Sequence, residues 1–328
     1  MIEVILFALG LLILVKGADY LVDGASSVAH KLKIAPIVIG LTIVSFGTSA
    51  PELVVSLTSA LKGSTDIAFG NVVGSNIFNI LLILGLTAMI YPLKVQTNTI
   101  WKEIPMSFLG AILLVVLGLQ TQIDVTGLHT IDWRSAEQVG SISRSNGMVL
   151  LSFFIIFLFY TFGIAKTSGE NDMKIKHYTI PRSAIMITLG LLALTFGGRL
   201  AVDNAVTLAR MLNISDTFIG LTLVATGTSF PELFTNIAAA RKKNTDIAIG
   251  NVVGSNIFNI FFILGLTSVV REIPIRGAQV FDIGVLWLTT TLLFLFLFVW
   301  RKYHLGKLEG FIMLAGYVAY TIYLILRG

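Results

Sequence analysis

The stretch GTSAPE at residues 47–52, followed by GNVVGSNIFN at residues 70–79, occurs twice in this chain. GTSFPE at residues 227–232 and GNVVGSNIFN at residues 250–259 repeat it at a constant offset of 180 positions. About two-thirds of the aligned residues around these motifs are identical. Both copies place glutamate, serine, threonine and asparagine inside apolar sequence. Such groups are costly in lipid and therefore indicate a functional site.

The composition defines the class of protein. The chain has 328 residues, of which 55% are hydrophobic and 12% charged, about half the charged fraction of soluble domains. Most of the sequence falls into apolar runs of about 20 residues, the length that spans a hydrocarbon core. We therefore predict an all-α polytopic membrane protein. The absence of cysteine excludes disulfides and thiolate metal sites. The net charge of +5 lies in short loops, which is typical of membrane topology and not of nucleic-acid binding.

Ten transmembrane helices are predicted from these runs and from the Gly, Pro and charge signals between them. They cover residues 2–29, 36–61, 66–91, 102–120, 147–166, 181–210, 216–240, 246–271, 278–300 and 308–327. The loop at residues 121–146 is expected to be a solvated extracellular connection.

The repeat extends upstream of the motifs, since Gly17 recurs as Gly197. Equivalent helices are five apart, an odd number, so the two copies enter the membrane in opposite directions. We predict two inverted five-helix repeats, residues 1–170 and 171–328. In secondary transporters such repeats bind their ligands near the membrane midplane, at the repeat interface.

Lysine and arginine are about twice as numerous in the loops on the side opposite the termini as in the loops on the terminal side. This bias predicts that both termini lie outside and that residues 167–180 lie in the cytoplasm. The charged residues in the outer halves of helices one and six are expected to be interfacial charges or partners of one another, not ligands. They are Lys16, Asp19, Asp23, Arg199 and Asp203.

Each GTS motif precedes a proline that interrupts its helix. Pro51 cannot donate a helical hydrogen bond to the carbonyl of Gly47, and Pro231 cannot donate one to Gly227. We therefore expect helices two and seven to kink or unwind at these points. Carbonyl groups freed at membrane depth are tolerated where they line a cavity, and there they can coordinate cations.

The polar residues of both motifs converge at mid-depth. Glu52 lies ten residues before Lys62, about 15 Å along a helix and about half of the hydrocarbon core. Residues four apart share a helix face, which groups Asn71 with Ser75 and Asn79, and Asn251 with Ser255 and Asn259.

This set of groups suits a hard cation. Two carboxylates, hydroxyls, amide oxygens and kinked carbonyls are ligands for Ca²⁺, whereas zinc or copper prefers nitrogen or sulfur. Na⁺ is nearly the size of Ca²⁺, and two glutamates neutralise either one Ca²⁺ or two Na⁺. For Glu52 and Glu232 we predict ligation. For the glycines at 70, 74, 250 and 254 we favour close helix packing instead.

The motifs resemble those of the cation/Ca²⁺ exchanger superfamily, specifically prokaryotic Na⁺/Ca²⁺ exchangers, over nearly the whole chain. The resemblance implies a core of helices two, three, seven and eight, across which the long helices one and six slide. The resemblance also implies the cation ligands. The carboxylates of Glu52 and Glu232 are shared between Ca²⁺ and Na⁺, and the backbone carbonyls of Thr48 and Thr228 bind Ca²⁺. The flanking Na⁺ sites are completed by Ser49, Ser75, Ser229 and Ser255 with the carbonyls of Ser45 and Ala225, and the middle site is lined by Asn79 and Asn259.

One position departs from the family, whose members often carry Asp where this chain has Asn259. If that Asp is normally protonated, Asn is a neutral mimic. If it binds an ion or K⁺, the stoichiometry or the coupling ion changes.

The sequence thus favours a Na⁺/Ca²⁺ antiporter that works by alternating access in the inner or plasma membrane of a prokaryote. The alternative is an antiporter of H⁺ and Ca²⁺, or of another divalent cation, with Glu52 or Glu232 protonated. We expect Ca²⁺, Na⁺ and the lipid bilayer as partners, a monomeric transport unit, no cofactor and no enzymatic activity. An intramembrane aspartyl protease is disfavoured because its chemistry has no role for the amides around the two glutamates.

Overall fold

The computed structural model describes residues 2–95, 97–120, 122–123, 131–132, 135–164, 178–212, 225–300 and 302–327. Within these residues eight helices are long and apolar enough to cross a membrane. The bent pair Pro36–Thr48 and Ala50–Leu61 makes a ninth if it is counted as one span. The all-helical membrane class is therefore confirmed.

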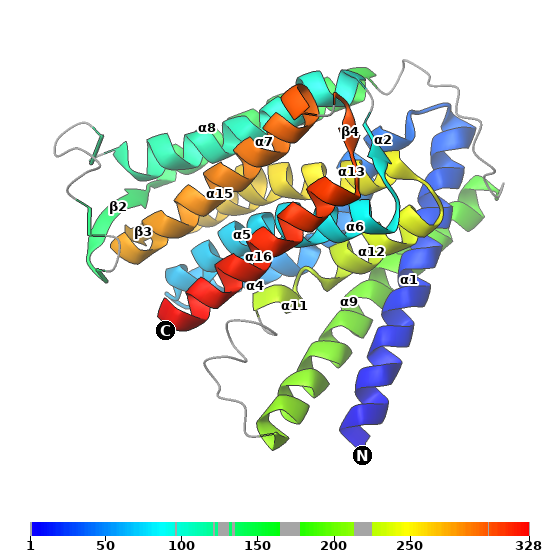
Figure 1. Cartoon of the computed structure of the whole chain (residues 1–328), viewed down its shortest axis with the longest axis horizontal. Helices are drawn as coiled ribbons and strands as arrows, with labels where there is room; N and C mark the ends of the chain where they lie inside the picture. The colour runs from blue at the N-terminus through cyan, green and yellow to red at the C-terminus, as the bar shows by residue number, and fades with distance from the viewer. Residues whose placement is uncertain are drawn as a thin grey trace.

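The first half of the chain forms α1 (Ile2–Leu32), α2 (Pro36–Ile39), η1 (Gly40–Val44), α3 (Ser45–Thr48), α4 (Ala50–Leu61), α5 (Thr65–Phe78), η2 (Asn79–Leu84), α6 (Gly85–Ile90), α7 (Thr97–Gly118) and α8 (Arg144–Ile164). The second half forms α9 (Ile180–Met211), α11 (Ala225–Gly227), α12 (Phe230–Arg241), α13 (Thr245–Ile257), η6 (Phe258–Leu264), α14 (Gly265–Val270), α15 (Gly277–Leu295), η7 (Phe296–Trp300) and α16 (Lys307–Arg327). Figure 1 shows their arrangement.

Two short antiparallel ribbons join the halves. β1 (Leu93–Lys94) pairs with β4 (His304–Leu305), and β2 (Gln138–Ile142) pairs with β3 (Ile273–Arg276). Residues 216–224 of the helix predicted for 216–240 lie outside the described residues, as do residues 121, 124–130 and 133–134 of the 121–146 loop and residues 167–177 of the predicted cytoplasmic connection.

The helices break at the GTS motifs, as expected. Pro36–Thr48 and Ala50–Leu61 are bent by 45° where Ser49 leaves helical geometry, at φ −83° and ψ 7°. Ser229 has nearly the same conformation, φ −90° and ψ 10°, between α11 and α12. Pro51 and Pro231 are the second residues of α4 and α12, where the missing N–H costs no helical bond. The break therefore puts a new helix start directly before each glutamate.

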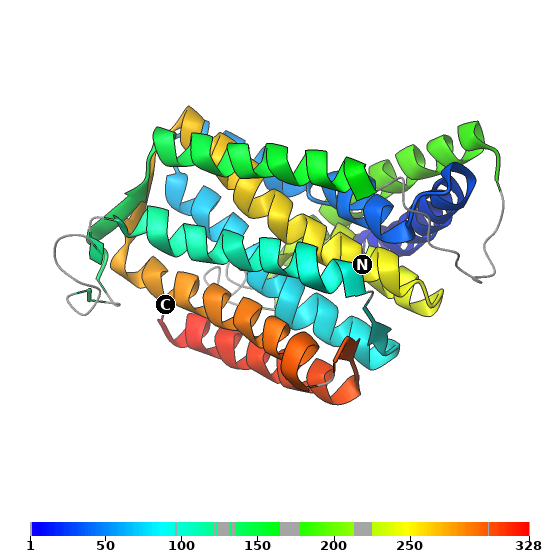
Figure 2. The ribbon, with the colours of Figure 1, turned by 90° about the horizontal axis from the view of Figure 1, so that it is seen from above.

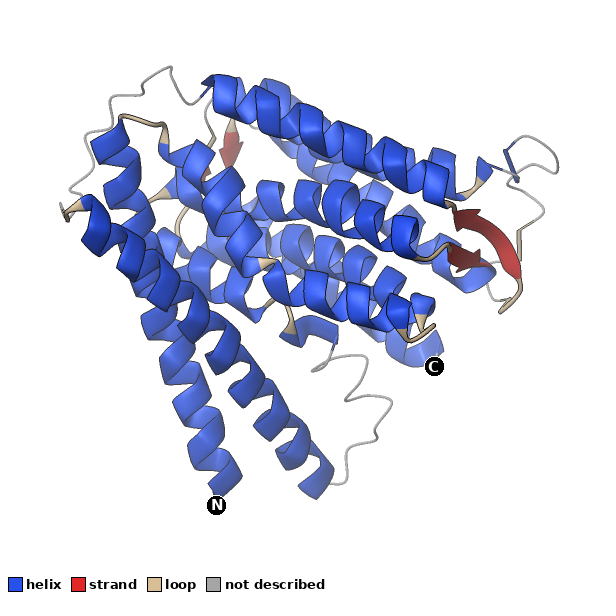
Figure 3. Cartoon of the chain, turned by 180° about the vertical axis from the view of Figure 1, so that it is seen from behind, coloured by secondary structure: helices blue, strands red, loops and turns tan. Residues whose placement is uncertain are grey.

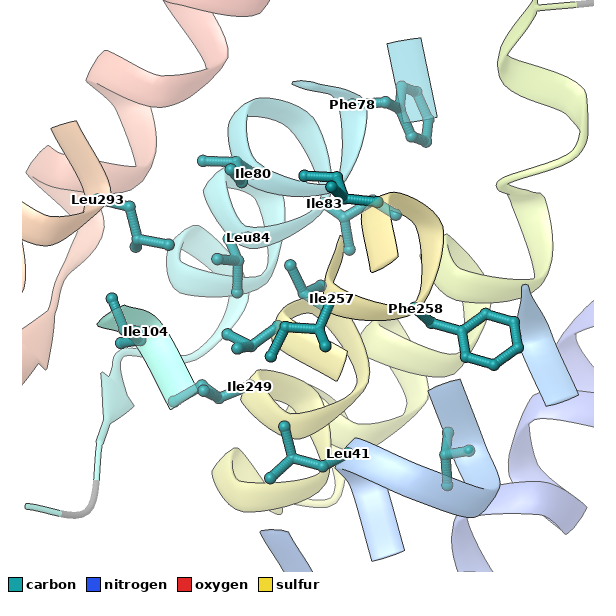
Figure 4. Packing of buried hydrophobic residues seen from close by; sticks show 14 of the residues in the cluster. Leu41, Phe78, Ile80, Ile83, Leu84, Ile104, Ile249, Ile257, Phe258 and Leu293 are labelled. Atoms are coloured by element: carbon teal, nitrogen blue, oxygen red, sulfur yellow. The ribbon is translucent and has the colours of Figure 1, made fainter. Parts of the chain in front are cut away.

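The two helices that carry GNVVGSNIFN form the centre of the molecule. In the apolar part of Thr245–Val270, 94% of the residues are buried, and in Thr65–Ile90 72%, against 17–39% in the other spans. Figure 4 shows Leu84 of η2 and Ile257 of α13 in the buried cluster. A helix that is buried all round in this way must be apolar or small on every face, which matches the sequence of both copies.

Short π-helical segments interrupt both central helices. η2 begins at Asn79, and η6 begins at Phe258, one residue before Asn259. A π-turn inserts an extra residue into a helix, and such turns are frequent at functional sites. The asparagines of the two motifs therefore stand where the helix changes its register.

α1 and α9 form a separate pair. They have 31 and 32 residues and run side by side, leaning away from the other helices (Figures 1 and 3). Glycines allow the close approach: a Cβ on Gly17 would lie 3.0 Å from the carbonyl oxygen of Gly190. Seen from above, α7, α8, α15 and α16 run alongside one another, with α1 and α9 gathered at the far end of the molecule (Figure 2).

The two copies of GNVVGSNIFN pack differently. A Cβ on Gly250 would lie 2.7 Å from the carbonyl oxygen of Ile37, and one on Gly254 would lie 2.7 Å from the carbonyl oxygen of Leu41. Among the described residues, a Cβ on Gly70 or Gly74 would meet no atom within 4 Å. The close-packing interpretation is therefore confirmed for Gly250 and Gly254. For the first pair it stays a prediction, because residues 217 and 221, the repeat equivalents of Ile37 and Leu41, lie outside the described residues.

This difference yields a prediction. Gly254→Ala should lower the free energy of unfolding by about 1–3 kcal/mol, because the methyl group is forced against the η1 backbone. Gly74→Ala, the equivalent change in the other half, should leave stability unchanged or slightly higher. Thermal unfolding of both variants in detergent, followed by circular dichroism, measures this. Equal shifts in Tm would contradict the packing difference.

Candidate cation site

The two glutamates lie at the start of helices. Glu52 is in the first turn of α4 and Glu232 in the first turn of α12, and both are buried. The N-terminal end of a helix carries partial positive charge from unpaired N–H groups, which stabilises a nearby carboxylate. The proline-broken helices thus provide the electrostatic setting for negative charge at membrane depth.

Each glutamate is bonded by a serine of the other motif. The hydroxyl of Ser49 donates to Oε1 of Glu232 at 2.9 Å, and the hydroxyl of Ser229 donates to Oε1 of Glu52 at 2.8 Å. Ser229 Oγ also lies 3.0 Å from Ser75 Oγ. Since a hydroxyl donates only once, Ser75 must donate in that contact. The bonds form two sets, Glu232 with Ser49 and Glu52 with Ser229 and Ser75, and each set joins the two halves.

Three buried side-chain oxygens of the glutamates and serines in the two motifs have no hydrogen-bond partner among the described residues. Within the described residues, Oε2 of Glu52, Oε2 of Glu232 and the hydroxyl of Ser255 are buried without a hydrogen bond. Burying a polar or charged group without compensation is strongly unfavourable. A bound cation provides the missing interaction, so these residues fit a site that holds a cation during transport.

Threonine and asparagine form a second reciprocal pair of contacts. The hydroxyl of Thr48 donates to Oδ1 of Asn251 at 3.1 Å, and that of Thr228 donates to Oδ1 of Asn71 at 3.2 Å. These bonds fix the threonines whose backbone carbonyls the resemblance implies as Ca²⁺ ligands. The helix-face pattern grouped the two asparagines with the motif, but their role as supports for the threonines was missed.

The supporting contacts continue one step outward. Nδ2 of Asn251 donates to Oδ1 of Asn236 at 2.7 Å, and Nδ2 of Asn71 donates to Oγ of Ser56 at 2.9 Å. Asn236 and Ser56 are equivalent positions in the repeat. No sequence signal other than this equivalence marks them.

The two asparagines that the resemblance implies for a middle site, Asn79 and Asn259, have different contacts. Nδ2 of Asn79 donates to Oδ1 of Asn256 at 3.0 Å, while both polar atoms of Asn259 are buried without a partner within the described residues. Asn256 is a further residue that the sequence did not single out.

The remaining predicted ligands are placed as follows. Ser45 is buried and donates its hydroxyl to the carbonyl of Leu41 at 2.7 Å, which leaves its own carbonyl as the implied ligand. Ala225 is the first residue of α11, and its side-chain environment lies outside the described residues. Among the described residues no group of three or more His, Cys, Asp or Glu could hold a metal ion.

The chain matches proteins of one family along its length. Residues 2–163 and 182–326 match the family described as "Sodium/calcium exchanger protein". The putative antiporter CaxA of Alkalimonas amylolytica is 35% identical over 98% of each chain, and the sodium/calcium exchanger MaX1 of Methanosarcina acetivorans is 30% identical over 98% of each. A structure of the sodium-calcium exchanger NCX_Mj soaked with 10 mM Na⁺ and no Ca²⁺ aligns with a TM-score of 0.80 and 34% identity, covering 97% of each chain.

The fold and the family match define an integral membrane cation/Ca²⁺ antiporter, which is a transporter. The protein belongs to the sodium/calcium exchanger family. The resemblance seen in the sequence motifs is thereby confirmed.

The serine network generates a prediction. Ser229→Ala removes the hydroxyl that orients Glu52 and should weaken Ca²⁺ binding about ten-fold or more, since a hydrogen bond to a charged group contributes about 1.5–3 kcal/mol. Ser152→Ala is the control, because Ser152 is exposed and bonds only the carbonyl of Met148 in its own helix. Equilibrium binding of ⁴⁵Ca²⁺ to purified protein in detergent measures both. An unchanged affinity in Ser229→Ala would remove the serine from the site.

Proposed function

We propose that this protein exchanges Na⁺ for Ca²⁺ by alternating access at a single site centred on Glu52 and Glu232. The observation that carries the proposal is the pair of unpartnered carboxylate oxygens, one from each motif, buried within a network of hydroxyls and amides. Without a cation, this arrangement leaves two buried acidic groups uncompensated.

The composition of the site supports these two ions. Ca²⁺ takes 6–8 oxygen ligands in flexible geometry, and Na⁺ accepts the same ligands at similar distances. Two carboxylates balance one Ca²⁺ or two Na⁺, so the ions compete and do not bind together. The proposed ligands are Glu52, Glu232, the carbonyls of Thr48, Thr228, Ser45 and Ala225, the hydroxyls of Ser49, Ser75, Ser229 and Ser255, and Asn79 and Asn259.

The proposal includes an architecture of ten helices in two inverted halves, residues 1–170 and 171–328. Reciprocal contacts between residues at equivalent positions support it: Ser49 with Glu232 mirrors Ser229 with Glu52. We further propose that both termini lie outside, that the 167–180 connection is cytoplasmic, and that a monomer in a prokaryotic plasma membrane is the transport unit.

Asn259 is proposed as a neutral member of the middle site. Its two buried polar atoms have no partner among the described residues, so it is free to contact a hydrated or bound ion. A site with two carboxylates then retains its charge balance with either ion.

The test is ⁴⁵Ca²⁺ uptake into proteoliposomes loaded with Na⁺, K⁺ or choline at matched pH. We expect uptake only from Na⁺-loaded vesicles, abolished in Glu52→Gln and Glu232→Gln because each variant removes one of the two charges that balance Ca²⁺. Glu272→Gln, at an exposed glutamate bonded to Ser141, is the matched control and should transport normally.

Other outcomes identify other mechanisms. Equal uptake from choline-loaded vesicles that follows an imposed pH gradient would replace Na⁺ with H⁺ as the coupling ion. Uptake from K⁺-loaded vesicles alone would assign K⁺ to the middle site. Full activity in both glutamate variants would contradict the site itself.

Membrane potential provides a further prediction. An exchange of three Na⁺ for one Ca²⁺ moves one net charge outward during Ca²⁺ uptake. An inside-positive potential of about 60 mV should then raise the Ca²⁺ accumulation ratio about ten-fold, since one charge carries about 2.3 kcal/mol per 100 mV. A potassium diffusion potential set with valinomycin applies this voltage. Accumulation that is insensitive to voltage would indicate an electroneutral two-to-one exchange.

A further inference from the structure

A lysine at the end of α12 holds α1. Nζ of Lys242 lies 2.8 Å from Oδ1 of Asp23 and 3.3 Å from Oδ1 of Asp19, and it donates to the carbonyl of Asp19 at 2.9 Å. Asp19 and Asp23 are one turn apart and share a face of α1. The expectation that Asp19 and Asp23 are partners of the other charges on helices one and six is not met, because Lys242, at the end of the helix that carries Glu232, pairs with both. The alternative that they are interfacial charges stays a prediction.

The contact continues into the next turn. Nδ2 of Asn244 donates to Oγ of Ser26 at 3.0 Å. The side chains of Lys242 and Asp23 are 28% and 19% exposed, so water screens their attraction less than it screens a surface pair. The turn after α12 thus binds three successive turns of α1, on the same side of the molecule.

The repeat provides equivalents of Lys242 and Asp23 in the other half of the chain, at the opposite end of the site, but these two residues do not form an ion pair. Lys62 corresponds to Lys242, and Asp203 of α9 corresponds to Asp23. Among the described residues neither Lys62 nor Asp203 forms an ion pair within 4.0 Å. In α9 the position that corresponds to Asp19 is Arg199, so the charge at that position is reversed.

A pocket of about 160 Å³ occupies this end instead. Arg199 and Asp203 line it together with Thr228 and with Pro51 and Pro231, the residues that directly precede the two site glutamates. α1 packs along α12, whereas its counterpart α9 makes no comparably extensive contact with α4. One end of the site is therefore closed by helix contact, and the other end adjoins a pocket.

We propose that the ion pair of Lys242 with Asp19 and Asp23 is a latch that keeps the site closed on one side while the pocket is open on the other. Transport requires its release, and Lys62 pairs with Asp203 when the pocket closes. The proposal rests on the alternating access proposed above and adds the residues that select between its two states.

The latch also predicts a bias between these states. The closed end has two acids for its lysine, whereas the other end offers one acid beside a repelling arginine. A conformational equilibrium shifts by the difference in interaction free energy between the two states. The state with the Lys242 ion pair formed is therefore favoured at rest.

Cysteine alkylation tests this, because the chain contains no native cysteine. Val55 lines the open pocket, and Thr235, its equivalent on α12, is fully buried. Val55→Cys and Thr235→Cys therefore report the two sides separately. Adding Lys242→Gln should slow alkylation of the Val55→Cys thiol by a maleimide about five-fold or more and speed that of the Thr235→Cys thiol, in line with typical conformational coupling.

Controls separate the latch from general loosening. Lys62→Gln, at a lysine with no ion pair among the described residues, should change the Val55→Cys rate by no more than about two-fold. It should leave the Thr235→Cys rate unchanged or slower, because the proposed pairing of Lys62 with Asp203 stabilises the other state. A loosened fold would raise both rates. The charge exchange Lys242→Asp with Asp23→Lys should restore both rates toward the parent values.

Either of two results would overturn the proposal: unchanged rates in Lys242→Gln, or the same response in Lys62→Gln. Alkylation does not depend on which ion drives transport. Unchanged alkylation with intact Na⁺-driven uptake would therefore reject the latch alone. Reciprocal alkylation changes without Na⁺-driven uptake would reject the coupling ion alone.

Discussion

Two carboxylates buried between apolar helices constrain every element near them. Glu52 and Glu232 must face helix starts, hydroxyls or a cation, because no solvent is available at that depth. The proline breaks in α4 and α12 supply the helix starts, and the serines of the opposite motifs supply the hydroxyls. The asparagines of the central helices then fix the threonines beside them. If either carboxylate were lost, the helix start and the serine hydroxyl that face it would have no charged group to contact.

The repeat makes the two halves chemically similar, but the structure uses them differently. In the identical decapeptides, Gly254 lies against the η1 backbone, whereas no described residue would come within 4 Å of a Cβ on Gly74. Lys242 is paired, whereas Lys62 is not paired among the described residues. An inverted-repeat transporter exposes its site to one side at a time only if its halves adopt different arrangements. In the inverted-repeat architecture that we propose for this chain, these local differences meet that requirement.

Much of the fold and the centre of the site could be predicted from the sequence. Apolar runs gave the spans, prolines gave the breaks, and the polar motifs identified Glu52, Glu232 and their serines. The supporting roles of Asn71 and Asn251 could not be predicted, since a side chain on a shared face has several possible partners. The close packing of Gly254 against η1 could not be predicted either, because the decapeptides around Gly74 and Gly254 have the same sequence. The ion pair of Lys242 depends on the lateral position of α1, which no local pattern encodes.

The reciprocal serine–glutamate bonds also affect how the protein is made. Glu52 and Ser229 are separated by 177 positions, so at about 5–20 residues per second the ribosome needs about 10–35 s to supply the partner. During that interval the first half is already in the membrane with an acidic side chain that its own motif does not satisfy. The nascent chain must shelter this group, in water at the translocation channel or against its own helices, until the second half arrives. Formation of these bonds is thus a late event in biogenesis, because it requires both copies of the motif.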